Sequence, residues 1–290
     1  MWLTFALISV FFVSTSALLE KKALTKEHAL EFSATLSVYS FLLSVPLFLV
    51  FNTGTYTIPV VPLCIIALVA VIGAAAFVLV MTSFRHMEVS EISPFIAVGP
   101  AVTGLFGFIF LGELLTSVQV LGMVVIVLGI YFLELKSPKD MFSPFKAIYK
   151  NIYIHYILLS LVLYAICDVL GKYALTAYDI SPIQYLFYFQ MFLAIFFLAW
   201  IHIKKRHGIA IHISKENAGL ICIIALLTLS HRFTHISAMQ LTSIGIAVAI
   251  HRSSTLITTL VGGKIYKEGH LIHKGIAAVA VICGVVLIAM

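Results

Sequence analysis

Ten apolar stretches, each long enough to cross a lipid bilayer, constrain this chain more than any other feature of its sequence. Crossing about 30 Å of hydrocarbon takes roughly 20 residues of α-helix. The stretches lie near residues 2–19, 30–51, 60–82, 89–111, 117–135, 152–174, 182–203, 217–238, 241–263 and 271–290. Because lipid offers the backbone no hydrogen-bond partners, the sequence predicts an all-α integral membrane protein with about ten transmembrane helices.

The composition excludes the usual soluble classes. Of the 290 residues, 62% are hydrophobic and only 10% are charged, whereas soluble domains are about 25% charged. A mean hydropathy of +1.12 also excludes a disordered chain, and nucleic-acid binding is not expected although the pI is about 9.1. The four cysteines lie far apart in apolar runs, without the spacing of a disulfide framework or metal motif. The first apolar run lacks a basic leader, so we interpret it as a retained span.

The two halves of the chain resemble each other. A shift of 155 residues superposes Thr103 on Thr258, Glu113 on Glu268 and Gly129 on Gly284, and a shift of 151 aligns residues 17–25 with 168–176. We therefore divide the chain into a five-helix repeat (1–136), a basic linker (137–151) and a second five-helix repeat (152–290). An odd number of spans in each repeat predicts two inverted five-helix repeats, a layout in which the substrate site lies between the halves.

The basic residues indicate which side of the membrane is cytoplasmic. Fifteen of the eighteen Lys and Arg residues fall in the connections after odd-numbered spans, Lys172 falls on the other side, and Arg232 and Arg252 lie within spans. Basic connections stay in the cytoplasm, so both termini are predicted outside. For a prokaryote, this is a multi-pass protein of the cytoplasmic (inner) membrane.

Several short motifs resemble the repeat of a known transporter family. They are Ile92-Ser93-Pro94 through Pro100, Leu111-Gly112-Glu113-Leu114-Leu115-Thr116, Gln119, Gly122 and Gly129. This pattern resembles the EamA-type repeat of the drug/metabolite transporter superfamily. The second half departs from it, with Lys267-Glu268 for the usual Gly-Glu and Thr255 where the family usually has proline. The resemblance implies a ten-helix carrier of small metabolites that works by alternating access, with no particular substrate.

Arg252 is the most informative single residue. It lies about eleven residues into the ninth predicted span, roughly 16 Å from the end of the helix. An arginine at the centre of a membrane helix costs at least about 2.5 kcal/mol unless it faces water or a partner. We expect it to face a cavity; a structural ion pair, or a helix broken near Gly245 that leaves it shallower, is the alternative.

Arg232 and Asp168 lie at similar predicted depths, each about six residues from a helix end. If they pair, Arg252 is left free for a carboxylate or phosphate, which guanidinium binds bidentately. If they do not pair, Asp168 can take a substrate ammonium group. Either arrangement favours a small anionic or zwitterionic metabolite over a lipophilic cation, which two buried arginines would repel.

The histidines His231 and His251 adjoin these arginines. Imidazole titrates near neutral pH, so they are candidates for proton coupling or for a polar lining of the site. His231 and His235 have the i, i+4 spacing of metal ligands. No metal is expected there, because the neighbouring arginines oppose a divalent cation.

Four further residues complete the candidate set. Gln190, with Tyr185 or Tyr188, is predicted to line the cavity, although an interhelical hydrogen bond explains a lone glutamine equally well. Glu113 and Glu268 each precede an apolar helix. They are interpreted as caps that interact with free amides at the helix start, or as coupling carboxylates.

These observations predict a secondary transporter of small polar metabolites, amino acids or other anionic or zwitterionic compounds. Its partners are the substrate and membrane lipid, with no nucleic acid, and it works as a monomer or homodimer. No P-loop, HExxH or GxSxG motif is present, so no ATP, cofactor or enzymatic activity is expected. The alternatives are a multidrug or cation efflux carrier and, with less support, an intramembrane enzyme acting on lipid-linked substrates.

Overall fold

The computed structural model describes residues 1–24, 29–52, 54–87, 95–134, 151–206, 218–265 and 271–289. Helices make up all the regular secondary structure in these residues. They are α1 (Trp2–Leu24), α2 (Ala29–Phe51), α3 (Val60–His86), α5 (Gly99–Leu111), α6 (Ser117–Glu134), α8 (Ile152–Ala177), α9 (Pro182–Arg206), α10 (Ala218–Leu241), α11 (Ile244–Arg252), α12 (Ser254–Ile265) and α13 (Leu271–Ala289).

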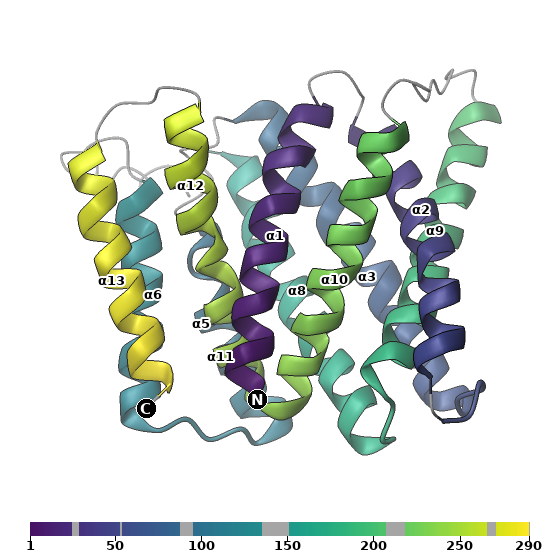
Figure 1. Cartoon of the computed structure of the whole chain (residues 1–290), viewed down its shortest axis with the longest axis horizontal. Helices are drawn as coiled ribbons and strands as arrows, with labels where there is room; N and C mark the ends of the chain where they lie inside the picture. The colour runs from purple at the N-terminus through teal and green to yellow at the C-terminus, as the bar shows by residue number, and fades with distance from the viewer. Residues whose placement is uncertain are drawn as a thin grey trace.

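The helices run side by side as a membrane bundle (Figure 1). Six of the described helices are long and apolar enough to cross a bilayer alone. The other four spans contain the shorter apolar stretches Gly99–Leu111, Ser117–Leu133, Ile244–Thr258 and Val279–Ala289. The predicted all-α membrane fold is therefore confirmed.

Both chain ends lie at the same end of the bundle, the lower one in Figure 1. We call it the terminal end, and the opposite end, where α6 stops and α8 starts, the linker end. Helix α1 runs from the terminal end to the linker end, whereas α8, the first helix of the second half, runs the other way (Figure 1). The second repeat is therefore inverted relative to the first.

Helix packing follows the internal duplication. Helix α1 packs on α10 and α3 packs on α8, while α2 pairs with α9 and α6 with α13. In the duplication, α1, α2, α3 and α6 correspond to α8, α9, α10 and α13. Exchanging corresponding helices turns the α1–α10 pair into the α8–α3 pair and leaves the α2–α9 and α6–α13 pairs unchanged. The repeats interleave about a pseudo-twofold axis, and the interior of the bundle is built from both.

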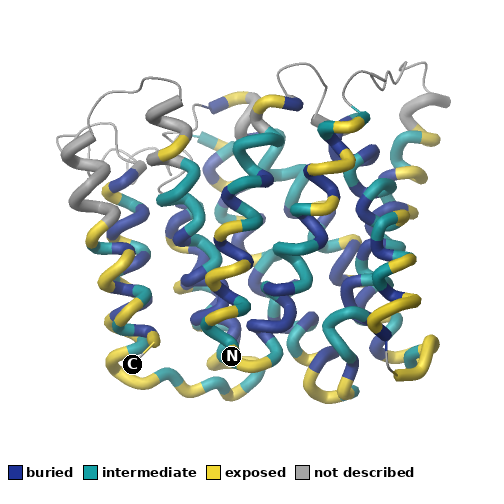
Figure 2. Tube along the Cα trace, viewed as in Figure 1, coloured by how far each residue is buried: buried dark blue, intermediate teal, exposed yellow. Residues whose placement is uncertain are grey.

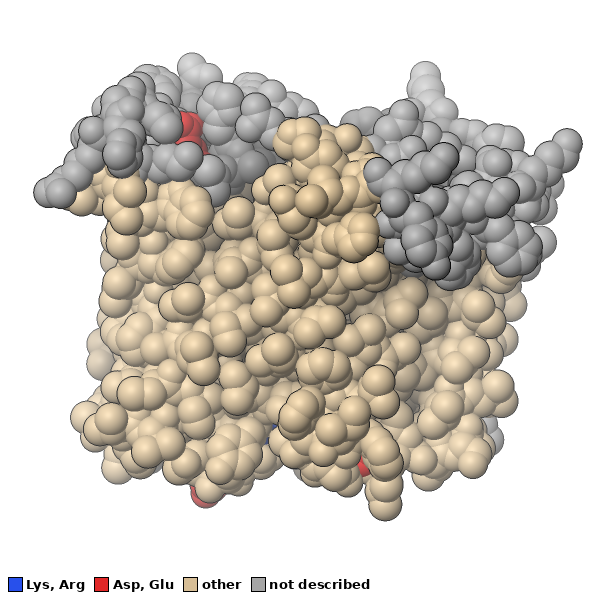
Figure 3. All heavy atoms as spheres, turned by 180° about the vertical axis from the view of Figure 1, so that it is seen from behind, with Lys and Arg blue, Asp and Glu red and all other residues tan. Residues whose placement is uncertain are grey.

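The outer surface suits lipid. Buried positions face the interior of the bundle, and exposed positions follow the outer sides of the helices and the connections at the terminal end (Figure 2). Seen from behind, the described surface is almost free of Lys, Arg, Asp and Glu (Figure 3). Over the described surface as a whole, the exposed apolar side chains include Leu68, Leu105, Phe108, Ile195, Ile223 and Ile282. Apolar side chains in this number face hydrocarbon rather than water.

The fourth and ninth spans are both broken, at equivalent positions. In the second repeat α11 stops at Arg252, Ser253 forms a turn, and α12 begins at Ser254. The turn is tighter than an α-helical turn, because the Ser253 amide donates to the Ile250 carbonyl three residues earlier instead of to the carbonyl four residues earlier. The alternative of a helix broken near Gly245 is therefore wrong, since Gly245 lies inside α11.

The first repeat has the same break at Val98, 155 residues earlier. The Val98 amide donates to the Phe95 carbonyl, and the Val98 carbonyl accepts from the Ala101 amide. Ser253 makes the equivalent two bonds, to the Ile250 carbonyl and from the Leu256 amide. Pro100 follows the break in the first repeat and lacks an amide hydrogen. Thr255 stands there in the second repeat, where the Ser253 hydroxyl instead donates to the Ile250 carbonyl at 2.6 Å.

Candidate functional site

Arg252, Arg232 and Asp168 all lie deep in the bundle. Arg252 is the last residue of α11, eight residues or about 12 Å from Ile244. Asp168 and Arg232 each lie nine residues, about 14 Å, from the terminal ends of α8 and α10, because both helices extend further than predicted. All three residues are nevertheless only partly buried. Partly exposed charged residues at this depth in a membrane bundle are costly unless they serve a polar site, so these three mark the candidate site.

Arg252 faces α5 and α8. A Cβ built on Gly99 would lie 3.8 Å from its Nε and 3.5 Å from Leu161. Its guanidinium interacts electrostatically with Tyr164 and Asp168. The Nε atom is buried, and no hydrogen-bond partner for it exists among the described residues. A buried guanidinium donor without a partner is costly, so this edge of Arg252 is suited to receive an anionic group.

Asp168 interacts electrostatically with Arg252 and forms no ion pair with Arg232. Its Oδ2 accepts a hydrogen bond from the Thr103 hydroxyl at 3.4 Å, and its charge acts on Arg252. Tyr164 and Asp168 are four residues apart on α8, so they share one helical face. The alternative in which Asp168 pairs with Arg232 is wrong, because similar depth along two helices does not fix which way their side chains point.

Arg232 is held by other partners. Its Nη1 donates to the Gln190 Oε1 at 2.5 Å, and its guanidinium carbon lies 5.2 Å from the centre of the Phe189 ring. The Glu20 carboxylate of α1 adds an electrostatic interaction. Arg232 thus has a hydrogen-bond partner, an aromatic ring and a carboxylate within the protein, whereas Arg252 keeps a buried donor without a partner.

Three histidines form a second polar cluster, between α1, α10 and α11. The ring centres of His251 and His235 lie 4.5 Å apart, and those of His251 and His231 lie 5.7 Å apart. The Ser9 hydroxyl is 3.1 Å from the His251 Nδ1 and donates to the His231 carbonyl. Within the described ranges, no three metal-ligating side chains are arranged to hold a metal ion.

The remaining predicted residues lie elsewhere. The Tyr188 hydroxyl donates to the Tyr56 carbonyl at 2.7 Å, in the α2–α3 connection at the terminal end. Glu113 binds Lys172 and the first amide of α11, so it caps a helix of the other repeat and not α6, which follows it. Glu268 lies outside the described residues.

Sequence reasoning missed several residues of this region. Tyr164 interacts electrostatically with Arg252, and Thr103 donates to Asp168. Glu20 interacts electrostatically with Arg232, and Ser9 lies at hydrogen-bond distance from His251. Each lies within an apolar run, where a single hydroxyl or carboxylate changes the hydropathy little. Tyr164 could have been found from the sequence, because it lies four residues before Asp168 and therefore on the same face of the helix.

Comparison with known proteins agrees with this architecture. The sequence profile of the EamA-like transporter family matches residues 1–135 and 151–290. A solved structure, titled only "Crystal structure of protein", superposes with a TM-score of 0.75 at 12% sequence identity, covering 99% of this chain and 95% of its own. At that identity the likeness shows the fold alone. No curated protein matches the sequence.

Proposed function

The chain belongs to the EamA-like transporter family, which makes it a membrane transporter of small molecules, and from that premise we propose that it carries small anionic or zwitterionic metabolites bound at Arg252 and Asp168. The family expected from the Gly112-Glu113 motif is thus confirmed in both halves of the chain. The substrate class rests on the residues of this chain alone.

The buried, unpartnered Nε of Arg252 is the observation that carries the proposal. A carboxylate or phosphate would satisfy it and would gain the bidentate geometry of a guanidinium. Asp168 interacts electrostatically with Arg252 and suits an ammonium group. Arg252 and Asp168 together favour an amino acid or a related zwitterion. A simple amine would bind Asp168 poorly, because the positive charge of Arg252 repels it.

The broken spans support an alternating-access mechanism. Arg252 ends one half-helix, and Gly99 begins the half-helix α5 of the other repeat. Transporters with inverted repeats bind substrate at such discontinuities near the bilayer midplane and then rock one repeat against the other. We propose the same for this chain, in the cytoplasmic membrane with both termini outside, as a monomer or homodimer.

A thermal-shift screen of the purified protein tests the substrate class. The screen compares amino acids, simple carboxylates, phosphorylated metabolites and lipophilic cations. A compound at 100 times its Kd should stabilise the protein by about 2.7 kcal/mol. We expect amino acids to stabilise the wild type, and Arg252→Ala to abolish the effect.

Two matched variants sharpen the test. Arg252→Lys keeps the charge and loses the guanidinium fork, so it should weaken binding less than Arg252→Ala. Asp168→Asn should weaken binding of amino acids while sparing simple carboxylates. Stabilisation by lipophilic cations alone, or an equal response of wild type and Arg252→Ala, would replace this proposal with cation efflux.

A further inference from the structure

A buried ion pair joins the two repeats at the terminal end of the bundle. The Glu113 Oε1 lies 2.5 Å from the Lys172 Nζ, and the Glu113 Oε2 accepts a hydrogen bond from the Ile244 amide at 2.9 Å. The Lys172 ammonium also donates to the Thr242 carbonyl. Glu113 comes from the first repeat, and the two partners of its carboxylate, Lys172 and Ile244, belong to the second.

Local backbone geometry directs Glu113 toward α11. Gly112 ends α5 in the left-handed conformation, with φ of 66°, which glycine adopts without strain. The Glu113 amide then turns back to donate to the Gly107 carbonyl at 3.2 Å. Thr116 and Gln119 form their own reciprocal cap at the start of α6. Glu113 is therefore free to cap a distant helix.

Both partner helices carry residues of the proposed substrate site. Lys172 lies one turn beyond Asp168 on α8, on the same helical face. Ile244 is the first residue of α11, and Arg252 is the last. The junction at the terminal end thus holds the two helices that present Asp168 and Arg252.

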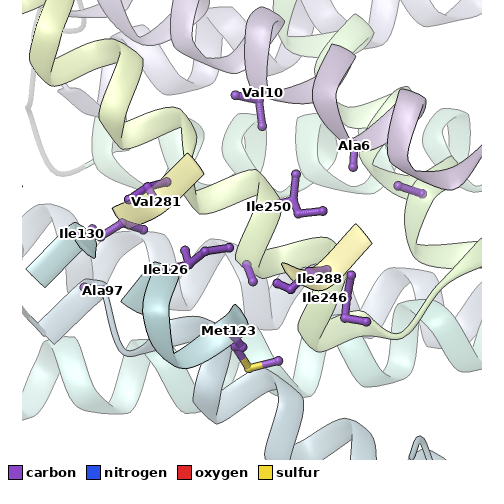
Figure 4. Close-up of a cluster of buried hydrophobic side chains, with 12 residues drawn as sticks. Ala6, Val10, Ala97, Met123, Ile126, Ile130, Ile246, Ile250, Val281 and Ile288 are labelled. Carbon is purple, nitrogen blue, oxygen red and sulfur yellow. The ribbon is translucent and has the colours of Figure 1, made fainter. Parts of the chain in front are cut away.

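Helix α11 is packed so as to transmit this restraint. All residues from Ile244 to Ile250 are buried. Figure 4 shows Ile246 and Ile250 surrounded by side chains of α1, α6 and α13, among them Val10, Ile126 and Ile288. A short helix so enclosed moves as a rigid piece, so displacement of its first residue also shifts its last.

We infer that Glu113 and Lys172 form a latch between the repeats, which positions the Arg252 helix and must open whenever the terminal end opens. This inference rests on the proposed transport function. The side chains of Lys172 and Glu113 are only 14% and 12% exposed, so the pair is largely withdrawn from water yet lies near the edge of the bundle. Water that enters from the terminal end can replace its partners when the repeats separate.

Labelling of a buried cysteine tests the latch without any substrate. Ile244 is 0% exposed and lies directly under the junction. In a chain whose four native cysteines are serine, Ile244→Cys is reacted in proteoliposomes with a membrane-impermeant maleimide. We expect slow labelling. Adding Glu113→Gln should accelerate it by about tenfold, the shift in population that corresponds to 1.4 kcal/mol, because the ion pair that favours the closed state is gone.

Ser243→Ala is the matched control. The Ser243 hydroxyl also caps α11, accepting from the Ile246 amide at 3.4 Å, but lies within the second repeat. A latch predicts that Glu113→Gln accelerates labelling and Ser243→Ala does not. Equal acceleration by both would reduce Glu113 to a structural cap, and no acceleration by Glu113→Gln would overturn the inference.

Two further variants keep the test decisive. If Glu113→Gln does not fold, Glu113→Asp keeps the charge but is too short to reach both Lys172 and Ile244, and it should give an intermediate rate. Lys172→Met should accelerate labelling as Glu113→Gln does. Because the labelling rate needs no substrate, a thermal-shift screen without hits would refute the proposed substrate class and leave the latch result standing.

Discussion

Gly99 lies against the guanidinium of Arg252, so that a Cβ at Gly99 would stand 3.8 Å from Nε and 4.0 Å from Nη2. Gly99 begins the half-helix after the break in the fourth span, and Arg252 ends the half-helix before the break in the ninth. The two interruptions thus meet inside the bundle. A glycine at this contact leaves room for a small side chain next to an arginine that keeps a buried donor without a partner.

A large side chain at Gly99 should obstruct the substrate site. We expect Gly99→Leu to fill the space beside Arg252 and to weaken amino acid binding at least about tenfold, equivalent to 1.4 kcal/mol. Gly99→Ala should bind nearly as the wild type, because its Cβ would make only ordinary van der Waals contact. Binding measured by calorimetry on purified protein separates the two, and equal affinities would argue against a substrate next to Gly99.

The Glu113–Lys172 pair should show strong coupling in stability. Lys172→Met leaves the Glu113 carboxylate with an unmet charge, which should lower the free energy of unfolding by roughly 1–3 kcal/mol. The double variant Glu113→Gln/Lys172→Met should lose less than the sum of the singles, because no lone charge remains. Reversible unfolding in detergent measures all four proteins. Simple additivity would mean that the two side chains do not interact.

Gln190 should matter as the partner of Arg232. Gln190→Leu removes the acceptor of the 2.5 Å hydrogen bond and should destabilise the protein by about 1.5–3 kcal/mol, the range for hydrogen bonds to charged groups. Gln190→Glu, nearly isosteric, should be at least as stable as the wild type because it pairs with the arginine. Thermal unfolding of the three proteins provides the comparison, and an unaffected Gln190→Leu would show that Arg232 has an adequate alternative partner.

The terminal end should face the outside of the cell. A reporter that is active only in the cytoplasm should be inactive when fused after Met290 and active when fused after Arg206, at the linker end, because the basic connections stay inside. Activity at Met290 would reverse the orientation while leaving the fold unchanged.

The spans were predictable from the sequence because their signal is local. A run of about 20 apolar residues indicates a helix regardless of its neighbours, and the predicted spans agree with α1, α2, α3 and α9 within a few residues. The inverted duplication followed from residue matches such as Glu113 with Glu268. The break at Ser253 was not predictable, since the proline that signals it in the first repeat is replaced by Thr255.

The contacts between helices could not be predicted in the same way. Depth along a helix suggested that Asp168 and Arg232 might meet, but their side chains point to different neighbours, Thr103 and Gln190. Glu113 was expected at the start of the helix that follows it, whereas its partner amide is at Ile244. Proximity in sequence gives no information about the rotation of one helix against another.

Glu113 is synthesised 131 residues before the amide that it caps. Helices enter the bilayer individually and pack afterwards, so the carboxylate has no partner until Lys172 and then Ile244 follow it into the membrane. The first half of the chain therefore cannot form the contact between Glu113 and Ile244 until a segment from the final quarter of the sequence has entered the membrane. A nascent chain that stops before Ile244 leaves Glu113 without the Ile244 amide as its partner, and only the nearly complete polypeptide can close the bundle.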